Sequence, residues 1–321
     1  MLVKAKRAIE SGMGKRPSER TVDELLQDGV VIIDKPSGPT SHQVTSWAGD
    51  ILGAAKAAHG GTLDPRVTGV LPVGIGNAVR AMDALHYGTK AYVGVMKMHG
   101  NVDIKRLEEV FKEFTGDILQ TPPMRSAVKR ERRTRRIETL TLLETSGRDV
   151  LFKVDCEAGT YIRSLCVDIG DALATGAHLQ DLRRTRAGSL TEDQAISLHD
   201  LKDAMIDHKS GNSEPLRKML HPKEVLLDQM PKIQIKDSAV DAICHGANLA
   251  MPGVVALDEG IEKDGAVAVM TLSGEGVGLG TALMDAQEIM KRAEGFAVNV
   301  SRVLMQRGTY TRMWTSSADK T

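Results

Sequence analysis

Residues 59–69, HGGTLDPRVTG, hold three glycines and one proline and lack both the helical and the alternating apolar periods, which predicts a loop. Asp64 lies inside this loop, directly before Pro65, which restricts Asp64 to extended backbone conformations. A carboxylate presented on such a loop can act as a nucleophile or as a base. Taken alone, an Asp-Pro pair in a loop is more often a turn, so the rest of the chain has to decide between the two.

Regular elements are predicted on both sides of this loop. The run GVVIIDKP (29–36) is rich in β-branched residues and ends at Pro-Ser-Gly-Pro, which predicts a strand followed by a turn. Residues 41–52 have helical spacing, with Ser41 as the expected N-cap. The other strong patterns predict strands at 91–98 and 150–158 and helices at 104–115 and 162–175.

A change of texture along the chain predicts a second domain. From Pro231 onward, short apolar runs are separated by glycines, a pattern typical of a small β-barrel. The 321 residues are enough for two domains, and we place the boundary near residues 228–232.

Composition excludes several classes of protein. The 42 basic and 42 acidic residues cancel, which excludes a protein that coats nucleic acid through bulk positive charge. No apolar stretch approaches the length of about 18 residues that a membrane helix needs, and the basic N-terminus lacks the apolar core of a secretory signal. Three widely spaced cysteines indicate buried thiols in a reducing compartment. We therefore expect a cytoplasmic protein that makes no contact with a membrane.

The densest charge lies between Arg125 and Arg136, where seven basic residues accompany one acidic residue for a net charge of +6. Arg183 and Arg184 belong to a second, smaller basic group. Arginine binds phosphate through a planar fork of donors, so both groups favour polyanion binding. The alternative is a charged, solvated surface without a ligand.

Five motifs occur in a characteristic order: GVVIIDKPSGPTSH (29–42), HGGTLDPRVTGVLPVGIG (59–76), KAYVG (90–94), GTYIRSL (159–165) and HLQDLRRTRAG (178–188). Together they resemble the TruB family of pseudouridine synthases. Two further stretches, TPPMRSAVKRERRTRRI (121–137) and PKIQIKDSAVDAICHGANLAMPGV (231–254), are similar to the archaeal and eukaryotic branch that includes dyskerin. The second of these resembles the start of a PUA domain, a small RNA-binding barrel.

The resemblance implies an α+β fold of two domains. The catalytic domain, 29–230, is expected to hold a mixed, largely antiparallel sheet flanked by helices, with the active cleft across it. The PUA domain is expected at 231–314 as a small β-barrel. An N-terminal extension, 1–28, should pack on the PUA domain, and residues 315–321 should form a tail.

The resemblance also implies roles for residues near the loop. Asp64 matches the catalytic aspartate of the GTLDP motif, Tyr92 the residue that stacks on the target base, and Arg163 the arginine that pairs with the aspartate. Each of the last two has a plainer alternative. Tyr92 could belong to a strand core, and Arg163 could pair with Asp168 or Asp171.

Four more residues match supporting positions of the family. Leu182 matches an apolar contact near the base, with an ordinary core position as the alternative. Lys35 and Pro36 match the motif that packs beneath the active-site loop. His59 is expected to shape this loop or to contact RNA.

RNA binding is expected from a basic loop, 121–137, that overhangs the cleft, and from the second basic group. The expected RNA-binding residues are Arg125, Lys129, Arg130, Arg132, Arg133, Arg183 and Arg184. The family's reaction needs no cofactor and no metal. In agreement, Gly74-x-Gly76 lacks the third glycine of a dinucleotide fingerprint, and neither a P-loop nor an HExxH motif occurs.

The function that the resemblance favours is pseudouridine formation in rRNA by the catalytic subunit of a guide-directed box H/ACA particle. Its expected partners are the H/ACA guide RNA, the rRNA substrate and small accessory proteins. The guide supplies sequence by base pairing, so the protein binds shape, phosphates and the extruded base. One alternative is a stand-alone tRNA pseudouridine synthase of the TΨC loop. Another is a non-catalytic RNA-binding scaffold in ribosome assembly, which Asp64→Ala would not affect.

Overall fold

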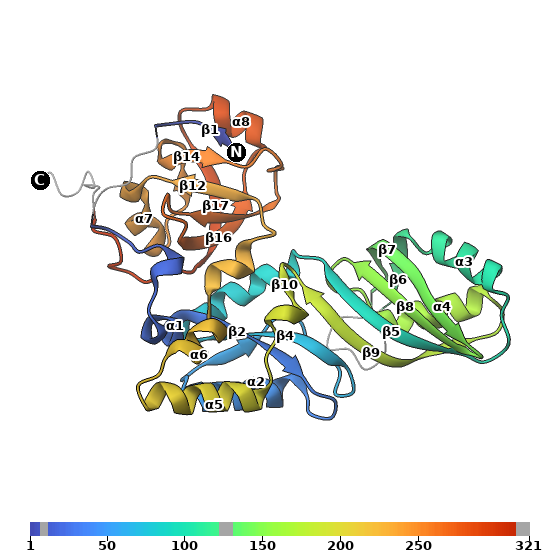
Figure 1. The fold of residues 1–321 in the computed structure, drawn as a ribbon. Coiled ribbons are helices and arrows are strands. Elements are labelled where there is room, and N and C mark those ends of the chain that lie inside the picture. The colour runs from blue at the N-terminus through green and yellow to red at the C-terminus, as the bar shows by residue number, and fades with distance from the viewer. Residues whose placement is uncertain (7–11, 122–130, 313–321) are drawn as a thin grey trace, which may run out of the picture.

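The computed structural model describes residues 1–6, 12–121 and 131–312. Within them, a ten-stranded sheet runs in the order β11-β2-β4-β9-β5-β8-β7-β6, with β10 added to β9 and β3 to β4. Figure 1 shows this long sheet with a smaller unit, built around a second sheet, above one of its ends. The strands are β2 (Gly29–Lys35), β3 (Ala57–His59), β4 (Thr68–Ile75), β5 (Lys90–Met98), β6 (Gly116–Gln120), β7 (Arg133–Ser146), β8 (Asp149–Cys156), β9 (Ala177–Ala187), β10 (Leu190–Thr191) and β11 (His221–Pro222).

The large sheet is mixed and largely antiparallel, which confirms the predicted fold class. Among the described strands of this sheet, β4 and β9 are the parallel neighbours, through Thr68 opposite Arg183 and Gly69 opposite Arg184. All other pairs of this sheet are antiparallel. The predicted strands at 29–36, 91–98 and 150–158 correspond to β2, β5 and β8 within one or two residues.

Helices cover the sheet in two groups and create two apolar cores. In Figure 1, α2 and α5 lie against β2 and β4, whereas α3 and α4 lie beside β5 to β8. Strand β2 is buried on both faces, which explains its continuous apolar run. The helices are α1 (Val22–Asp28), α2 (Ser41–Leu52), α3 (Ile104–Glu113), α4 (Ile162–Ala172), α5 (Leu198–Lys209) and α6 (Glu214–Met219), with 3-10 segments η1 (Pro17–Glu19), η2 (Gly76–His86), η3 (Glu192–Gln194) and η4 (Lys223–Leu227).

Two local predictions need correction. The N-cap of α2 is Thr40, whose hydroxyl accepts from the Gln43 amide, whereas Ser41 is buried and turns toward the neighbouring loop. The predicted basic loop 121–137 is shorter than expected, because residues from Arg133 onward form β7 and pair with β6. Residues 122–130 lie outside the described part of the chain.

The C-terminal unit is a seven-stranded sheet in the order β1-β14-β12-β15-β16-β17-β13. Every strand from β12 to β17 contributes to a single apolar core, together with α7. Glycine is required in β16, because a Cβ on Gly280 would lie 2.4 Å from the Asn299 carbonyl oxygen. The elements are β1 (Leu2–Val3), β12 (Lys232–Ile235), β13 (Leu249–Ala250), β14 (Val254–Leu257), β15 (Ala266–Met270), β16 (Gly276–Ala282), β17 (Phe296–Val303), α7 (Asp237–Cys244), α8 (Ala286–Lys291) and η5 (Met251–Gly253).

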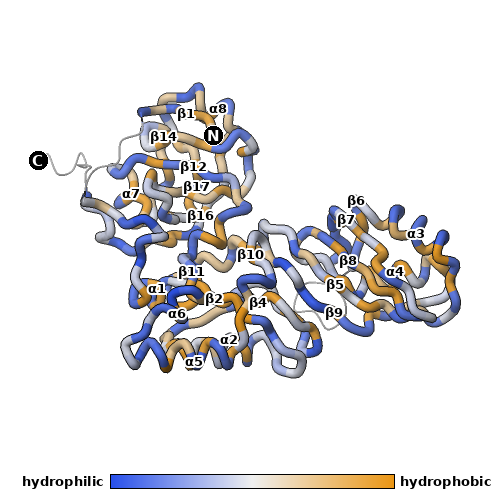
Figure 2. Tube along the Cα trace, viewed as in Figure 1, coloured by the Kyte–Doolittle hydropathy of each residue, from blue (hydrophilic) through white to orange (hydrophobic). Residues whose placement is uncertain are grey.

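The N-terminal segment divides between the two units. Strand β1 pairs with β14 at the edge of the C-terminal sheet. Helix α1 instead packs on the large domain, and its Leu25 is fully buried in the core shared with α2 and α5. Figure 2 shows hydrophobic residues along β2 and β4 and a hydrophilic stretch on β9 between apolar neighbours. Among the described helices, none is long and apolar enough to cross a membrane.

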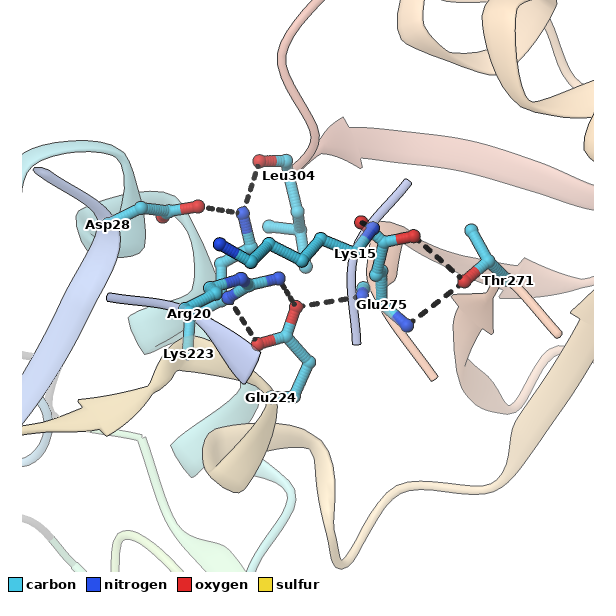
Figure 3. Close-up of polar contacts among 9 residues, drawn as sticks. Lys15, Arg20, Asp28, Lys223, Glu224, Thr271, Glu275 and Leu304 are labelled. Atoms are coloured by element: carbon cyan, nitrogen blue, oxygen red, sulfur yellow. Dashed lines mark hydrogen bonds and ion pairs between the residues drawn. The ribbon is translucent and has the colours of Figure 1, made fainter. Parts of the chain in front are cut away.

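A polar junction joins the N-terminal segment, η4 and the C-terminal unit (Figure 3). Arg20 donates to both carboxylate oxygens of Glu224 at 2.8 Å, and Glu224 also accepts from the Gly276 amide at 3.0 Å. Lys223 donates to Asp28 and, at 3.0 Å, to the Leu304 carbonyl oxygen. Apolar residues of η2 and η4 pack against β15 and β16 beside it. The junction therefore combines buried ion pairs with a shared apolar core.

Candidate active site

A cavity of about 570 Å³ opens where the loop between β3 and β4 meets the start of α4 and the middle of β9. Asp64 lies on its wall, and so do Arg163 and Leu182. The full lining is Asp64, Pro65, Arg66, Val67, Arg163, Leu179, Gln180, Asp181 and Leu182. Three of the residues predicted for the site therefore meet at one cavity although they lie far apart in the sequence.

Asp64 and Arg163 form an ion pair across this cavity. Arg163 projects from the first turn of α4, and both side chains are about half exposed, at 54% and 51%. The alternative partners of Arg163 were Asp168 and Asp171, and among the described residues neither of them forms an ion pair with it. Burial and the neighbouring Asp171 raise the pKa of Asp168. A guanidinium beside a carboxylate favours its ionised form.

Buried polar side chains hold the loop from below. Lys35 has no exposed surface, and its Nζ donates at 2.9 Å to the carbonyl oxygens of Pro36, Pro65 and Val67. Ser41 Oγ donates to the Leu63 carbonyl oxygen and accepts from the Leu63 amide, both at 2.9 Å. These contacts fix the backbone on either side of Asp64. The sequence signalled Lys35 through its motif, whereas the contacts of Ser41 were missed.

Arg184 is buried, with 1% of its surface exposed, so the expectation that it binds RNA is wrong. Its Nε donates to the Val70 carbonyl oxygen at 2.7 Å and its Nη1 to the Gly61 carbonyl oxygen at 3.0 Å. Arg183 points the other way and forms a two-pronged ion pair with Asp34, at 2.9 and 3.0 Å. A second carboxylate, that of Glu192, also neutralises Arg183. RNA binding by Arg183 remains a prediction that these carboxylates oppose.

Tyr92 lies beneath the loop rather than on the cavity wall. It is 8% exposed, packs in the core that contains Leu63, Val67 and Leu182, and lies opposite Arg184 in the pairing of β5 with β9. Burial raises the pKa of Tyr92 above its usual range. Stacking of Tyr92 on a base therefore stays a prediction. Leu182 is equally buried but does reach the cavity.

His59 ends β3 and packs edge-on against His42, with ring centroids 4.8 Å apart. Both of its ring nitrogens are buried and have no hydrogen-bond partner. Burial, aided by His42 and Arg184, lowers the pKa of His59 to about 4. The imidazole is therefore neutral at physiological pH and does not act as a cationic RNA contact.

The basic segment approaches the site from one side. Arg132 and Arg163 line a second cavity of about 330 Å³, together with the exposed apolar residues Leu119 and Val167. Arg133 is exposed at the start of β7. The other predicted members, Arg125, Lys129 and Arg130, lie outside the described residues. Within residues 1–6, 12–121 and 131–312, no group of three His, Cys, Asp or Glu side chains could hold a metal ion.

Comparison with known proteins identifies the family. The family model for the N-terminal domain of TruB pseudouridylate synthases matches residues 50–162, and that for the C-terminal domain of tRNA pseudouridylate synthase B matches 163–228. The models for the PUA and DKCLD domains match 231–304 and 1–45. The chain belongs to the TruB family of pseudouridylate synthases, which are isomerases that act on RNA. Its C-terminal unit is a PUA domain.

Close relatives share the whole architecture. A probable tRNA pseudouridine synthase B of Methanopyrus kandleri is 50% identical over 98% of this chain and 93% of its own length. The relative in Archaeoglobus fulgidus is 48% identical over 99% of this chain and 98% of its own. Among solved structures, an archaeal box H/ACA Nop10–Cbf5 complex aligns with a TM-score of 0.91 at 46% identity, covering 98% of both chains. An H/ACA particle bound to a substrate RNA containing 2′-deoxyuridine aligns at 0.89 and 45%, covering 98% and 96%.

Proposed function

We propose that this chain is the catalytic subunit of a guide-directed H/ACA particle and converts uridine to pseudouridine in rRNA with Asp64 as the nucleophile. The observation that carries the proposal is the Asp64–Arg163 ion pair at the cavity of a chain whose full length aligns with H/ACA particle subunits. By analogy with those complexes and with a solved Cbf5–Nop10–Gar1 complex of similar structure, its protein partners are Nop10- and Gar1-like subunits, and its RNA partners are a guide and a substrate.

The geometry suggests how the residues divide the work. The target uridine must leave its helix to reach the cavity, which costs a few kcal/mol of stacking. Stacking on Tyr92 can recover about 1–3 kcal/mol of that, and Leu182 adds apolar contact. Asp64, held in its ion pair with Arg163, attacks the flipped nucleotide. The N1–C1′ glycosidic bond breaks, the uracil turns, and its C5 is joined to C1′ as Asp64 is released. The C5 proton is lost and N1 takes up a proton, so the overall reaction is an isomerisation that consumes no cofactor.

The remaining expectations are part of the same proposal. Cytoplasmic location is supported by three free, buried cysteines, Cys156, Cys166 and Cys244. The basic residues Arg132 and Arg133 are exposed beside the cavity, where phosphate contacts would position substrate. We keep the domain limits 1–28, 29–230, 231–314 and 315–321 as proposals; residues 313–321 lie outside the described part.

Activity on tRNA is the second candidate function, and a separate observation favours it. Curated relatives at 46–50% identity carry the name probable tRNA pseudouridine synthase B. A stand-alone tRNA enzyme would act on the TΨC loop without guide or accessory proteins. A non-catalytic scaffold is disfavoured, because it has no need of an Arg-paired aspartate at the mouth of a cavity.

One experiment separates the three functions. Purified protein is assayed for single-turnover pseudouridine formation on an rRNA fragment with its H/ACA guide and accessory proteins, and in parallel on naked tRNA. Asp64→Ala tests the nucleophile, and Asp203→Asn, at an exposed position of α5, is the matched control. Product on guided rRNA that Asp64→Ala abolishes supports the proposal. Product on tRNA alone supports the stand-alone enzyme, and tight guide binding without product on either supports the scaffold.

A further inference from the structure

Arg184 is a buried cation that no carboxylate neutralises. Among the described residues, none of the ion pairs involves it, and its Nη2 has no hydrogen-bond partner. Its hydrogen-bond acceptors are two backbone carbonyl oxygens, those of Val70 and Gly61. Burial of a charge is unfavourable unless polar partners compensate it, so an uncharged side chain would serve the core better if Arg184 only filled space.

The two hydrogen-bond partners of the Arg184 side chain both belong to the candidate site. Gly61 stands at the beginning of the loop that carries Asp64, and Val70 follows its end in β4. Nε holds Val70 at 2.7 Å and Nη1 holds Gly61 at 3.0 Å, so one rigid guanidinium sets the distance between the two ends of the loop. Tyr92 of β5 is the register partner of Arg184, so the brace lies directly beside it in the sheet.

The surroundings of Arg184 leave little freedom for an alternative arrangement. Gly69 adopts φ +100°, and a Cβ there would lie 2.2 Å from the Arg184 carbonyl oxygen. A Cβ on Gly61 would lie 3.1 Å from Arg184 Nη1 and 3.3 Å from Lys90 Cε. Lys90 is itself buried and donates to the Leu85 carbonyl oxygen at 3.0 Å. The loop backbone is thus packed directly on the arginine from both ends.

We propose that Arg184 is a positioning residue for pseudouridine formation, which fixes the two ends of the Asp64 loop, opposite Tyr92, through its hydrogen bonds to two carbonyl oxygens. The inference rests on the proposed function of Asp64. A misplacement of about 1 Å at a reacting centre can lower a rate about 100-fold, so loss of this brace acts on the chemical step. RNA affinity depends on exposed groups that Arg184 does not touch.

The test compares Arg184→Lys and Arg184→Met with Arg186→Lys. Arg186 is a suitable control because it lies on the same strand and donates to Thr89 Oγ1, the Gly188 carbonyl oxygen and Asp155, away from the loop. Single-turnover rates at saturating protein and dissociation constants for substrate RNA are measured on the assembled particle. Lysine lacks the planar fork with which the guanidinium of Arg184 holds both carbonyl oxygens. We expect both Arg184 variants to lose about 30- to 100-fold in rate with affinity changed less than threefold, and the control to stay within twofold.

Three outcomes would overturn the proposal: wild-type rates in Arg184→Lys, equal losses of rate and affinity, or the same loss in Arg186→Lys. If the Arg184 variants do not fold, Gly61→Ala tests the brace from its other side, because the added Cβ would lie 3.1 Å from Arg184 Nη1. A rate reduced several-fold at unchanged affinity then supports the brace, and an unchanged rate contradicts it. Asp64→Ala, assayed alongside, identifies failure of the underlying function: an active Asp64→Ala protein refutes that function, whereas an inactive one with a silent Arg184→Lys refutes only the brace.

Discussion

Buried cations occur in two regions of this protein, and the two regions neutralise them differently. Beneath the Asp64 loop, Lys35 and Arg184 donate to backbone carbonyl oxygens, and each makes at least two such bonds. At the junction of the N-terminal segment with the PUA domain, Arg20 pairs with Glu224 and Lys223 with Asp28. In the first region, neutral backbone carbonyl groups stabilise the buried cations. In the second region, carboxylates of opposite charge stabilise them.

Carbonyl oxygens and carboxylates suit different structural roles as partners of a buried cation. Carbonyl oxygens are fixed to the backbone, so a cation bonded to several of them defines the course of one loop. Their acceptor strength does not change with pH. A carboxylate sits on a side chain and titrates, so an ion pair joins elements from separate domains but depends on protonation. The comparison predicts strong and pH-dependent effects at the junction, and local, pH-independent effects beneath the loop.

The largest effect on stability is expected at the junction, from Lys223→Met. Removal of Lys223 leaves Asp28 buried without its cation, and burial already raises the pKa of Asp28. Loss of one partner of a buried pair typically lowers the free energy of unfolding by about 3–5 kcal/mol. Urea unfolding at pH 7 measures this loss. Lys232→Met, which removes an exposed pair with Asp228, should change stability by less than about 1 kcal/mol.

The pH dependence of the Lys223→Met loss tests its cause. A carboxylate with a raised folded-state pKa destabilises the fold as pH rises through that pKa, so protonation of Asp28 should relieve the variant. The difference from wild type should therefore shrink between pH 7 and pH 5. A constant difference would attribute the loss to packing instead of to the unpaired carboxylate.

The second effect is expected beneath the loop, from Lys35→Met. Three carbonyl oxygens lose their shared donor, and we expect about 2–3 kcal/mol of lost stability together with slower pseudouridine formation. Unlike the loss in Lys223→Met, the loss of stability in Lys35→Met should stay constant between pH 7 and pH 5, because no carboxylate among the described residues bonds Lys35 Nζ. A loss that recovers on acidification would contradict the division between the two regions.

A double-mutant cycle on Arg20 and Glu224 should give a coupling of about 2 kcal/mol. The pair is two-pronged, and its side chains are only 11% and 9% exposed. The same cycle on Arg106 and Glu109, at the exposed surface of α3, provides the reference and should give a much smaller coupling, because water screens the exposed pair. Equal couplings in the two cycles would mean that burial adds nothing to the junction pair.

The smallest effect is expected from His59→Gln, and it appears only in acid. The folded-state pKa of His59 is lowered to about 4, so the unfolded chain binds the proton more readily and stability falls as pH drops from about 6.5 toward 4. Because the residue is only partly buried, we expect the variant to remove about 1 kcal/mol of this acid-induced loss. Chemical unfolding at pH 7 and pH 4.5 measures it, and parallel pH curves for variant and wild type would refute the neutral buried imidazole.

Local patterns predicted the elements well where local physics decides them. The helix of residues 41–52 and the strand starting at Gly29 follow directly from apolar period and turn residues, and the structure has both. The end of the basic segment 121–137 was predicted wrongly as a loop, because its last residues are charged and yet form the start of the exposed strand β7. Charge density suggested a loop there, whereas pairing with β6 supplies hydrogen bonds that the sequence does not display.

The adjacent residues Arg183 and Arg184 show why side-chain roles were less predictable. A strand sends successive side chains to opposite faces, so one arginine meets carboxylates and the other enters the core. The sequence predicts that the two side chains point to opposite faces of the sheet, but it does not show which face is buried. The acceptors of Arg184 lie 114 and 123 residues earlier in the chain.

The sequence by itself determined the α+β class, the ordered motifs of the family and the presence of Asp64 on a glycine-bearing loop, because these depend on neighbouring residues and their periods. Only the tertiary structure decided that Asp64 meets Arg163, which lies 99 positions later, and which of two arginines braces the loop. Those outcomes depend on sheet register and on the parallel pairing of β4 with β9. Register arises from the simultaneous packing of distant strands, and no local stretch encodes it.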